Sequence, residues 1–477
     1  MSPAAVTSTV AAMIGAIAFI IGLHRMRTPG TARSGNALSA AGMALVIITA
    51  LITASTAGGT LDGWTALGIG LAVGGAAGAV GARQVEMTSV PQLVSLFNAV
   101  GGGAAAVLGI VAVVGAPGTL RMPLVTGIPV ALDLLIGGAT FTGSIIAAGK
   151  LQGIVPGRSI RIPGGRLLLL GVAVITVAGA VTLIAGPATG IALGVTAIGA
   201  CAFGVLLVLP IGGADAPVVV SLLNAFTGLA VAMAGFALDV QAMIIAGALV
   251  GAAGTTLTLA MASAMNRSVL AVMTGGFGAT TAAPTAPNTA TENVHAVNAD
   301  DVAIQLAYAS NVIIVPGYGL AAGRAQHELA ELAALLTAHG VHVAYAIHPV
   351  AGRMPGHMNV LLAEVDVPYE QMMQLDDANA AFSTCDVALV VGANDVTNPA
   401  ARRTGNAVSG MPILNVDTAR AVVVIKRSMA PGYAGISNEL FTGPRTGMLF
   451  SDAKQGLTDV IAAVKQYTDP RRERNTT

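Results

Sequence analysis

Charged side chains are scarce in this chain, because only 10% of its 477 residues are Asp, Glu, Lys or Arg. A soluble globular domain carries about 25% charged residues, so the composition excludes an ordinary soluble protein. The hydrophobic share of 54% instead indicates an integral membrane protein. The 23 basic and 23 acidic residues cancel, which gives no basis for nucleic acid as a partner.

Cysteine and aromatic residues are also few. Cys201 and Cys385 are the two cysteines of the sequence, which excludes a disulfide framework, and they match no metal-ligand spacing, so we expect no metal site. Aromatic residues make up 4% of the chain, whereas glycine reaches 60 residues. Small residues let membrane helices approach closely, so the apolar part is predicted to be a tight helix bundle to which a partner can add helices.

Long apolar runs occupy the first 265 or so residues. A helix needs about 20 apolar residues to cross a bilayer, and the sequence holds about nine such runs. They lie near residues 4–23, 36–56, 62–82, 92–116, 124–148, 166–186, 189–210, 217–237 and 240–264.

The basic residues between these runs are distributed unevenly. With nine spans, Arg121 lies in the loops of one side, whereas the loops on the side of the C-terminal domain hold Arg25, Arg27, Arg33, Arg83, Lys150, Arg158, Arg161, Arg166 and Arg267. Because cytoplasmic loops are enriched in Lys and Arg, the pattern predicts a multi-pass protein with its N-terminus outside and its C-terminal domain in the cytoplasm.

The chain divides into a membrane domain at residues 1–270, a linker at 271–300 and a soluble domain at 301–477. The linker is rich in Thr, Ala, Pro and Asn. Strands are predicted at 311–315, 341–347, 386–392 and 422–425, and helices at 321–339 and 457–467. We therefore predict a polytopic α-helical membrane domain followed by a Rossmann-like α/β domain with a doubly wound parallel sheet.

A glycine motif stands between the first predicted strand and the helix after it. Gly317-Tyr318-Gly319-Leu320-Ala321-Ala322 fits G-x-G-x-x-A, in which the glycines permit a tight turn and close approach of a pyrophosphate. The candidate dinucleotide contacts are Gly317, Tyr318, Gly319 and Ala322. The alternative is a structural glycine turn.

The second predicted strand lacks a feature of NAD sites. A carboxylate is expected about 20 residues after the glycine motif to bind the ribose, but this strand ends in Ala346-Ile347-His348-Pro349. Lys426, Arg427 and Ser428 follow a later strand, and two cations with a hydroxyl suit a 2′-phosphate. The sequence thus favours NADP(H), with a solvated basic turn as the alternative.

Three further loops are rich in glycine, proline and hydrogen-bonding side chains, although each can also be an ordinary turn. One extends from His348 to His357, one covers Gly392 to Asp395, and a third, at residues 430–435, has the composition of a lid. Their candidate cofactor-binding residues are His348, Val350, Ala351, Gly352, Arg353, Gly392, Ala393, Asn394, Asp395, Gly432, Tyr433 and Ala434.

Together these motifs resemble the β subunit of the proton-translocating NAD(P)+ transhydrogenases. In the soluble part the resemblance covers residues 317–322, 348–359, 392–399 and 426–435. In the membrane part it covers Val85-Glu86-Met87-Thr88, Gly212-Gly213-Ala214-Asp215 and Ala264-Met265-Asn266-Arg267-Ser268.

The resemblance implies that this chain binds NADP(H) and that a partner α subunit carries the NAD(H) domain and additional membrane helices. It also implies hydride transfer from NADH to NADP+, driven by proton entry into the cytoplasm across a bacterial-type inner membrane, by a dimer of the complex. In this family NADP(H) binds in a flipped orientation. Arg353, Asp395 and Tyr433 match positions linked to cofactor binding and coupling.

The resemblance also implies a proton path. Many family members have a histidine in the fourth span where this chain has Asn98, so the titrating group is expected to come partly from a partner helix. Other candidates are Asn224, Glu86, Asp133, Asp215, Arg267 and Ser268. Helix–helix hydrogen bonds are the alternative for the two asparagines, and capping for Glu86 and Asp215.

Two other functions stay open on the sequence. One is a transporter or channel gated by NADP(H) without hydride transfer, which the absence of an NAD(H)-binding partner would favour. The other is a structural membrane anchor with a decayed nucleotide fold, which the intact glycine motif and Lys426–Ser428 argue against.

Overall fold

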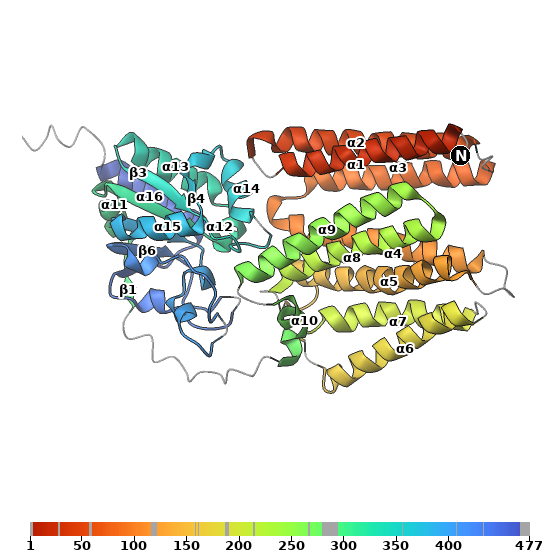
Figure 1. Ribbon diagram of the computed structural model, residues 1–477. Helices are drawn as coiled ribbons and strands as arrows, with labels where there is room; N and C mark the ends of the chain where they lie inside the picture. Colours follow the sequence, from red (N-terminus) through yellow and green to blue (C-terminus); the bar gives the residue numbers. More distant parts are fainter. Residues whose placement is uncertain are drawn as a thin grey trace, which may run out of the picture. The chain divides into compact units, whose positions relative to one another are not determined.

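The computed structural model describes residues 3–26, 29–56, 60–115, 122–157, 159–160, 162–186, 190–212, 215–265, 268–278, 294–354, 356–406, 408–432 and 434–467. Within it the chain forms two compact units (Figure 1). The first comprises Met1–Gly212 and Val218–Thr258, and the second Gly213–Pro217 and Leu259–Thr477.

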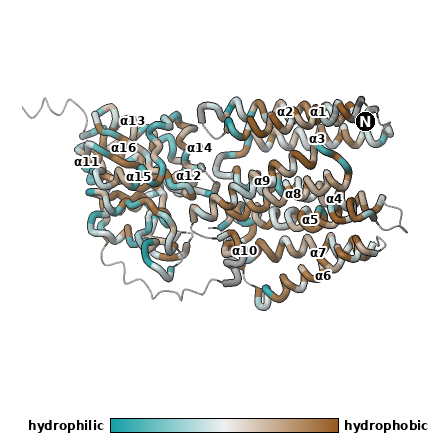
Figure 2. Tube along the Cα trace, viewed as in Figure 1, coloured by the Kyte–Doolittle hydropathy of each residue, from teal (hydrophilic) through white to brown (hydrophobic). Residues whose placement is uncertain are grey.

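The first unit is built from long apolar helices. They are α1 (Pro3–Arg25), α2 (Pro29–Thr56), α3 (Leu61–Gln84), α4 (Val90–Val114), α5 (Leu124–Gln152), α6 (Gly165–Ala185), α7 (Gly190–Val208), α8 (Ala216–Leu238) and α9 (Gln241–Ala264). Eight helices in the described part of the chain are long and apolar enough to cross a membrane, and Thr9–Arg25 in α1 is a shorter apolar helix. Apolar residues predominate along this unit (Figure 2).

Glycine brings helices α8 and α9 into backbone contact. A methyl group added at Gly228 would lie 2.3 Å from the backbone nitrogen of Gly251, and one at Gly247 would lie 2.4 Å from that of Ala232. No larger residue fits at such distances, so packing of small residues holds these two helices together.

Lys150 caps the C-terminus of the neighbouring helix α7. Its ammonium group donates to the carbonyl oxygens of Ile211, at 2.7 Å, and of Val208 and Leu209, at the C-terminus of α7. A cation there complements the helix dipole and satisfies carbonyls that have no partner within the helix. The sequence placed Lys150 only in a basic loop.

The second unit contains a seven-stranded, entirely parallel sheet with the order β1-β7-β6-β5-β2-β3-β4. The strands are β1 (His295–Ala296), β2 (Asn311–Pro316), β3 (His342–Ala346), β4 (Met372–Met373), β5 (Val387–Val391), β6 (Ala421–Ile425) and β7 (Thr446–Leu449). The predicted doubly wound α/β fold is thereby confirmed. The short β1, β4 and β7 were not predicted.

Helices cover both faces of the sheet. The α-helices of this unit are α10 (Val269–Gly278), α11 (Ala299–Ala307), α12 (Tyr318–Ala322), α13 (Gln326–Ala338), α14 (His357–Ala363), α15 (Leu375–Ala381) and α16 (Ala453–Tyr467). Val312 and Ile314 of β2 pack in a core with α11–α14 and α16. Ile313 and Val315 face the other way, toward a core that includes Ala378 of α15. The alternation is that of a pleated strand buried on both sides.

Short 3₁₀-helices complete both units: η1 (Met87–Ser89), η4 (Tyr369–Gln371), η5 (Phe382–Thr384), η6 (Asp395–Thr397), η7 (Pro399–Arg402), η8 (Val416–Thr418) and η9 (Glu439–Thr442). The single helix predicted at 321–339 is wrong, because α12 and α13 are separate. Arg324 lies between them at φ 50°, a left-handed conformation that a continuing helix cannot adopt.

The range predicted as a linker, 271–300, contains ordered residues at both ends. Most of α10, all of β1 and the first two residues of α11 lie within it. Residues 279–293 lie outside the described part of the chain.

Candidate functional site

Four loops that the sequence singled out follow the carboxyl ends of β2, β3, β5 and β6. Because these strands are neighbours in one parallel sheet, their carboxyl ends lie along the same edge. Ligands of open α/β sheets bind at this edge. The structure therefore gathers the candidate residues of the soluble domain at one edge, although together they span more than 100 positions of the sequence.

The loops after β2 and β5 are in direct backbone contact. The amide of Gly317 donates to the carbonyl of Val391, and that of Gly319 to the carbonyl of Gly392, both at 2.9 Å. A methyl group at Gly317 would lie 2.3 Å from the Cα of Ala393, and one at Gly319 would lie 2.6 Å from the Cα of Gly392. These glycines are thus required by the approach of two protein loops, whatever else they bind.

The helix after the glycine turn is short. Gly317 precedes α12, whose five residues end at Ala322. The sequence motif placed a long helix at this position, whose N-terminus would attract a pyrophosphate. The dipole of a long helix is therefore not available at this turn, and the amides of Gly317 and Gly319 are already bound by the loop after β5.

His348 is a buried anchor of the loop after β3. Its Nδ1 accepts from the amide of Val350 at 3.2 Å, so Nε2 carries the hydrogen and donates to the carbonyl of Pro412 at 2.7 Å. Burial lowers the pKa of His348 to about 4, and the bond to Pro412 opposes this shift. The imidazole is neutral at pH 7 and joins two loops; it is not a cation at the site.

Arg353, Tyr318 and His357 form a stacked group. The Arg353 guanidinium carbon lies 4.4 Å from the centre of the Tyr318 ring, and the rings of Tyr318 and His357 meet edge to face at 6.2 Å. The amide of Arg353 donates to His357 Nδ1 at 3.0 Å. Burial and the charge of Arg353 lower the pKa of His357. His357 ends the loop that the sequence singled out, but it was not among the candidate cofactor-binding residues.

Gly352 makes this arrangement possible. Its φ of 106° is left-handed, and a methyl group there would lie 2.6 Å from the Cβ of His357. Only glycine combines that conformation with that contact. Gly352 therefore fixes the conformation in which the loop passes Tyr318. This loop holds the candidate residues His348, Val350, Ala351, Gly352 and Arg353.

Asp395 joins the loop after β5 to the predicted lid. Its Oδ2 accepts from the amide of Ala434 at 2.9 Å, and a methyl group at Gly432 would lie 2.5 Å from Oδ1. Asn394 is fixed as well, because its backbone and side-chain oxygens accept from Asn438 Nδ2 at 2.9 and 3.2 Å. Tyr433 lies outside the described residues.

The two basic residues after β6, Lys426 and Arg427, have different roles. The Lys426 ammonium group donates to the carbonyls of Ser428, at 2.8 Å, and Ala430, and it lies 5.3 Å from the centre of the Phe441 ring. Burial lowers the pKa of Lys426, and the charge of Asp395 opposes the shift. Arg427 and Ser428 are exposed. Lys426 thus shapes the turn, and Arg427 presents its charge to solvent.

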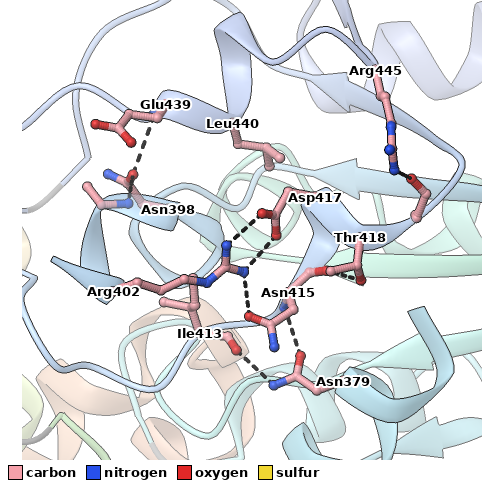
Figure 3. Close-up of polar contacts among 12 residues, drawn as sticks. Asn379, Asn398, Arg402, Ile413, Asn415, Asp417, Thr418, Glu439, Leu440 and Arg445 are labelled. Carbon is pink, nitrogen blue, oxygen red and sulfur yellow. Dashed lines mark hydrogen bonds and ion pairs between the residues drawn. The ribbon is translucent and has the colours of Figure 1, made fainter. Parts of the chain in front are cut away.

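A network that the sequence did not reveal holds the segment between β5 and β6 (Figure 3). Arg402 forms a two-point ion pair with Asp417 at 2.6 and 2.8 Å and donates to Asn415 Oδ1 at 2.6 Å. Asn379 accepts from the amide of Asn415 at 2.7 Å and donates to the carbonyl of Ile413 at 3.0 Å.

This network borders a cavity of about 510 Å³. Its lining includes Asn379, Arg402, Arg403, Pro412 and Asn415. Arg402 is paired with Asp417 and Arg403 with Glu439, so each of these two cationic side chains of the lining already has a carboxylate partner. Pro412 also receives the hydrogen bond of His348, which ties the cavity wall to the loop after β3.

Two polar candidates of the membrane part lie inside the helix bundle. Asn98 is 4% exposed; its Nδ2 donates to the carbonyl of Val220 in α8 at 3.2 Å, which is the helix–helix contact that the sequence left as an alternative. Asp133 in α5 is fully buried. Asn224 in α8 is half-buried.

The remaining membrane candidates lie at helix ends. Glu86 is exposed between α3 and η1, and Asp215 is buried directly before α8. Ser268 accepts from the amide of Ala271 at 3.1 Å and so caps the first turn of α10. Arg267 lies outside the described residues. No group of three metal-binding side chains occurs among the residues that the structure describes.

The chain combines apolar helices of membrane-spanning length with a parallel sheet whose glycine loops interlock. These features define the class of multi-pass membrane proteins that carry a Rossmann-like domain, the kind of domain that binds nucleotides in other proteins. A family model described as NAD(P) transhydrogenase beta subunit matches residues 8–463. Two sequences from Rhodospirillum rubrum, both named NAD(P) transhydrogenase subunit beta, are each 45% identical over 466 residues, which cover 95% of this chain and 98% of the relative. The chain belongs to this transhydrogenase family, as the sequence motifs indicated.

Proposed function

We propose that this chain binds NADP(H) at the carboxyl edge of its sheet and couples hydride transfer between NADH and NADP+ to proton translocation through its helix bundle. The NAD(H) is held by a partner α subunit, which adds membrane helices of its own. The complex lies in a bacterial-type inner membrane, with the sheet domain in the cytoplasm, and two copies of it form a dimer.

The observation that carries this proposal is the position of Arg427 and Ser428. They are exposed directly after β6, at the edge where the loops after β2 and β5 interlock. A guanidinium group with a neighbouring hydroxyl binds a phosphate through charge-assisted hydrogen bonds. No carboxylate that would exclude a 2′-phosphate follows β3, since the chain continues as Ile347-His348. These features fit NADP(H) better than NAD(H).

When bound, the nicotinamide ring supplies the hydride chemistry, so this chain needs no acid or base for that step. Its residues bind and orient the cofactor. Gly317 and Gly319 bring the backbone close to the pyrophosphate, and Arg353 on the Tyr318 ring supplies positive charge beside it. The Asp395–Ala434 bond connects the site to the lid segment, which excludes water.

The coupling proposed here requires two states with different affinity for NADP(H), biased by proton binding in the bundle. Asn98, Asn224, Glu86, Asp133 and Asp215 are the proposed polar groups of the proton path. Arg267 and Ser268 are proposed as the contact at the membrane face.

The test is a calorimetric titration of the full-length protein in detergent with NADPH and with NADH. Loss of a charged hydrogen bond costs about 1.5–3 kcal/mol, so Arg427→Ala is expected to weaken NADPH binding about ten- to a hundredfold. Binding of NADH is expected to be weak and insensitive to the change.

Arg420→Ala is the matched control, because Arg420 is exposed at the opposite end of β6, paired with Asp386. It should bind NADPH like the wild type. Equal binding of both nucleotides, or an unchanged affinity in Arg427→Ala, would contradict the proposed site. NADPH binding with proton flux but without hydride transfer to a partner would instead support a gated channel.

A further inference from the structure

Asp133 is unusual among the ionisable side chains of the bundle. In the described helices α1–α9, every other Asp, Glu, Lys, Arg or His lies within five residues of a helix end. Asp133 is the tenth of the 29 residues of α5. Ionisable groups deep in membrane helices are costly and usually serve a function.

The carboxyl group of Asp133 is completely enclosed by this chain. The residue is 0% exposed, and neither oxygen has a hydrogen-bond partner among the described residues. The adjoining residue of α4 is Gly109, where a methyl group would lie 2.9 Å from Oδ2. Val130 and Leu134, the neighbours on α5, belong to an apolar cluster.

This environment favours the neutral, protonated carboxyl group. A carboxylate in an apolar interior loses its hydration, and the backbone of Gly109 offsets only part of that loss, whereas the protonated form does not carry the penalty. Helices of this same chain already bury the side chain completely, so a cation of another subunit cannot neutralise it without displacing them. The ionised form of Asp133 is therefore stable only when water enters the bundle beside it. Without that water, the side chain takes up a proton and is neutral.

Asp133 lies on a line of small and polar residues. Asp133, Gly137, Thr140 and Ser144 are spaced by four, three and four residues, which places them on one face of α5. That face packs on α4, since a methyl group at Gly137 would lie 2.7 Å from the carbonyl oxygen of Gly102. We call these four residues and the facing Ser95, Gly102 and Gly109 of α4 the α4–α5 seam.

The far end of the α4–α5 seam also has unused hydrogen-bonding capacity. Ser95 Oγ donates to the carbonyl of Ser144 at 2.9 Å, while the Ser144 hydroxyl is buried and has no partner among the described residues. Ser144 lies about 16 Å along the helix from Asp133, at about 1.5 Å per residue. A buried hydroxyl and a buried carboxyl group, separated by small side chains, are sites where water can bind.

We propose that Asp133 is the proton-binding carboxyl group of this chain and that water in the α4–α5 seam connects it to Ser144. In one state the carboxylate takes up an excess proton that the water of the seam relays from the aqueous phase and becomes neutral; in the other it releases that proton to the same water, which carries it away. This assignment rests on the proposed proton translocation. It places an obligatory titrating group in this chain, whereas the family resemblance implied a group that comes partly from a partner helix.

The experiment uses the complete complex with its NAD(H)-binding partner, reconstituted in lipid vesicles. Hydride transfer and proton uptake are recorded together, the latter with a pH-sensitive dye. Asp133→Asn is expected to lower proton uptake and coupled hydride transfer by about a hundredfold, as loss of an acid–base group does. Asp133→Glu should retain more activity than Asp133→Asn, and binding of NADPH should persist in both.

Asp62→Asn is the matched control, since Asp62 is an exposed acid in the first turn of α3. It should pump like the wild type. Wild-type proton uptake per hydride in Asp133→Asn would overturn the inference and leave the proposed function intact. A wild-type complex that transfers hydride without moving protons would overturn the proposed function itself.

A second variant keeps the aspartate in place in case Asp133→Asn does not assemble. Gly109→Ala presses a methyl group on the carboxyl group, whereas Gly171→Ala in α6 meets no atom within 4 Å. Gly109→Ala is expected to slow proton uptake and coupled turnover, with Gly171→Ala unaffected. If an assembled Gly109→Ala complex equals Gly171→Ala in proton uptake, the assignment of Asp133 is wrong.

Discussion

Lys426 and Arg427 are adjacent basic residues with different surroundings. The ammonium group of Lys426 is bound by carbonyl oxygens of its own turn and partly buried against Phe441. Arg427 extends into solvent from the same turn. A lysine used to hold a loop has less capacity left for a ligand, so most of the affinity for a phosphate is expected from Arg427.

At the residue scale, His348 predicts a dependence of stability on pH. Its pKa is about 4 in the folded chain and about 6.5 in the unfolded chain, so the unfolded state binds the proton first. The stabilisation is complete above about pH 6.5 and is lost as the pH falls toward 4. At 1.36 kcal/mol per pKa unit, about 3 kcal/mol of unfolding free energy disappears across that range.

Calorimetric unfolding of the sheet domain in the full-length protein, recorded from pH 7 to pH 4, measures this effect. His348→Gln should be less stable at pH 7 and should have a flatter pH profile. His342→Gln changes an exposed histidine at the start of β3 and should keep the wild-type profile. Identical profiles for wild type and His348→Gln would mean that His348 does not titrate in this range.

At the scale of elements, the interlocked loops after β2 and β5 make a prediction at Gly392. Its φ is 69°, and a methyl group there would lie 2.4 Å from the backbone nitrogen of Leu320. Gly392→Ala therefore adds a steric clash to about 1–2 kcal/mol of left-handed backbone strain. We expect the two loops to separate and NADPH affinity to fall by about tenfold or more, measured by titration.

Gly340→Ala separates the two causes, because Gly340 has a φ of 83° but open space around it. This variant should lose stability by a similar strain and keep its NADPH affinity. Equal NADPH affinity in Gly392→Ala and Gly340→Ala would show that the loop contact does not shape the site.

The elements also differ in how well the sequence predicts them. The cores of β2, β3, β5 and β6 were predicted because each is an apolar run buried on both faces. The two-residue strands β1 and β4 were not, because a periodic pattern cannot be recognised over two positions. The break between α12 and α13 was missed because its cause is a local conformation at Arg324, not a Gly or Pro pattern.

At the scale of the whole molecule, the number of spans determines where the chain ends lie. Eight described helices meet the length and hydropathy expected of a span, and α1 contributes the shorter Thr9–Arg25. If α1 also crosses the bilayer, the count is odd. All the basic loop residues except Arg121 then lie on the side of the sheet domain, which is the asymmetry that the positive-inside rule expects.

We therefore predict that the N-terminus and the sheet domain lie on opposite sides of the membrane. An epitope tag at each end, tested by protease digestion of right-side-out vesicles, measures this. The N-terminal tag should be cleaved and the C-terminal tag protected until the vesicles are opened. Protection of both tags would mean that α1 does not span.

The sequence alone determined the class of the chain, because apolar span length, loop charge and strand periodicity are local properties that the fold must satisfy. It also placed the loops that end the central strands. The tertiary structure decided which side chains cooperate, since the contacts of Gly319 with Gly392, Asp395 with Ala434 and His348 with Pro412 join distant segments. The isolation of Asp133 likewise depends on how α4 packs on α5, which no single segment of sequence contains.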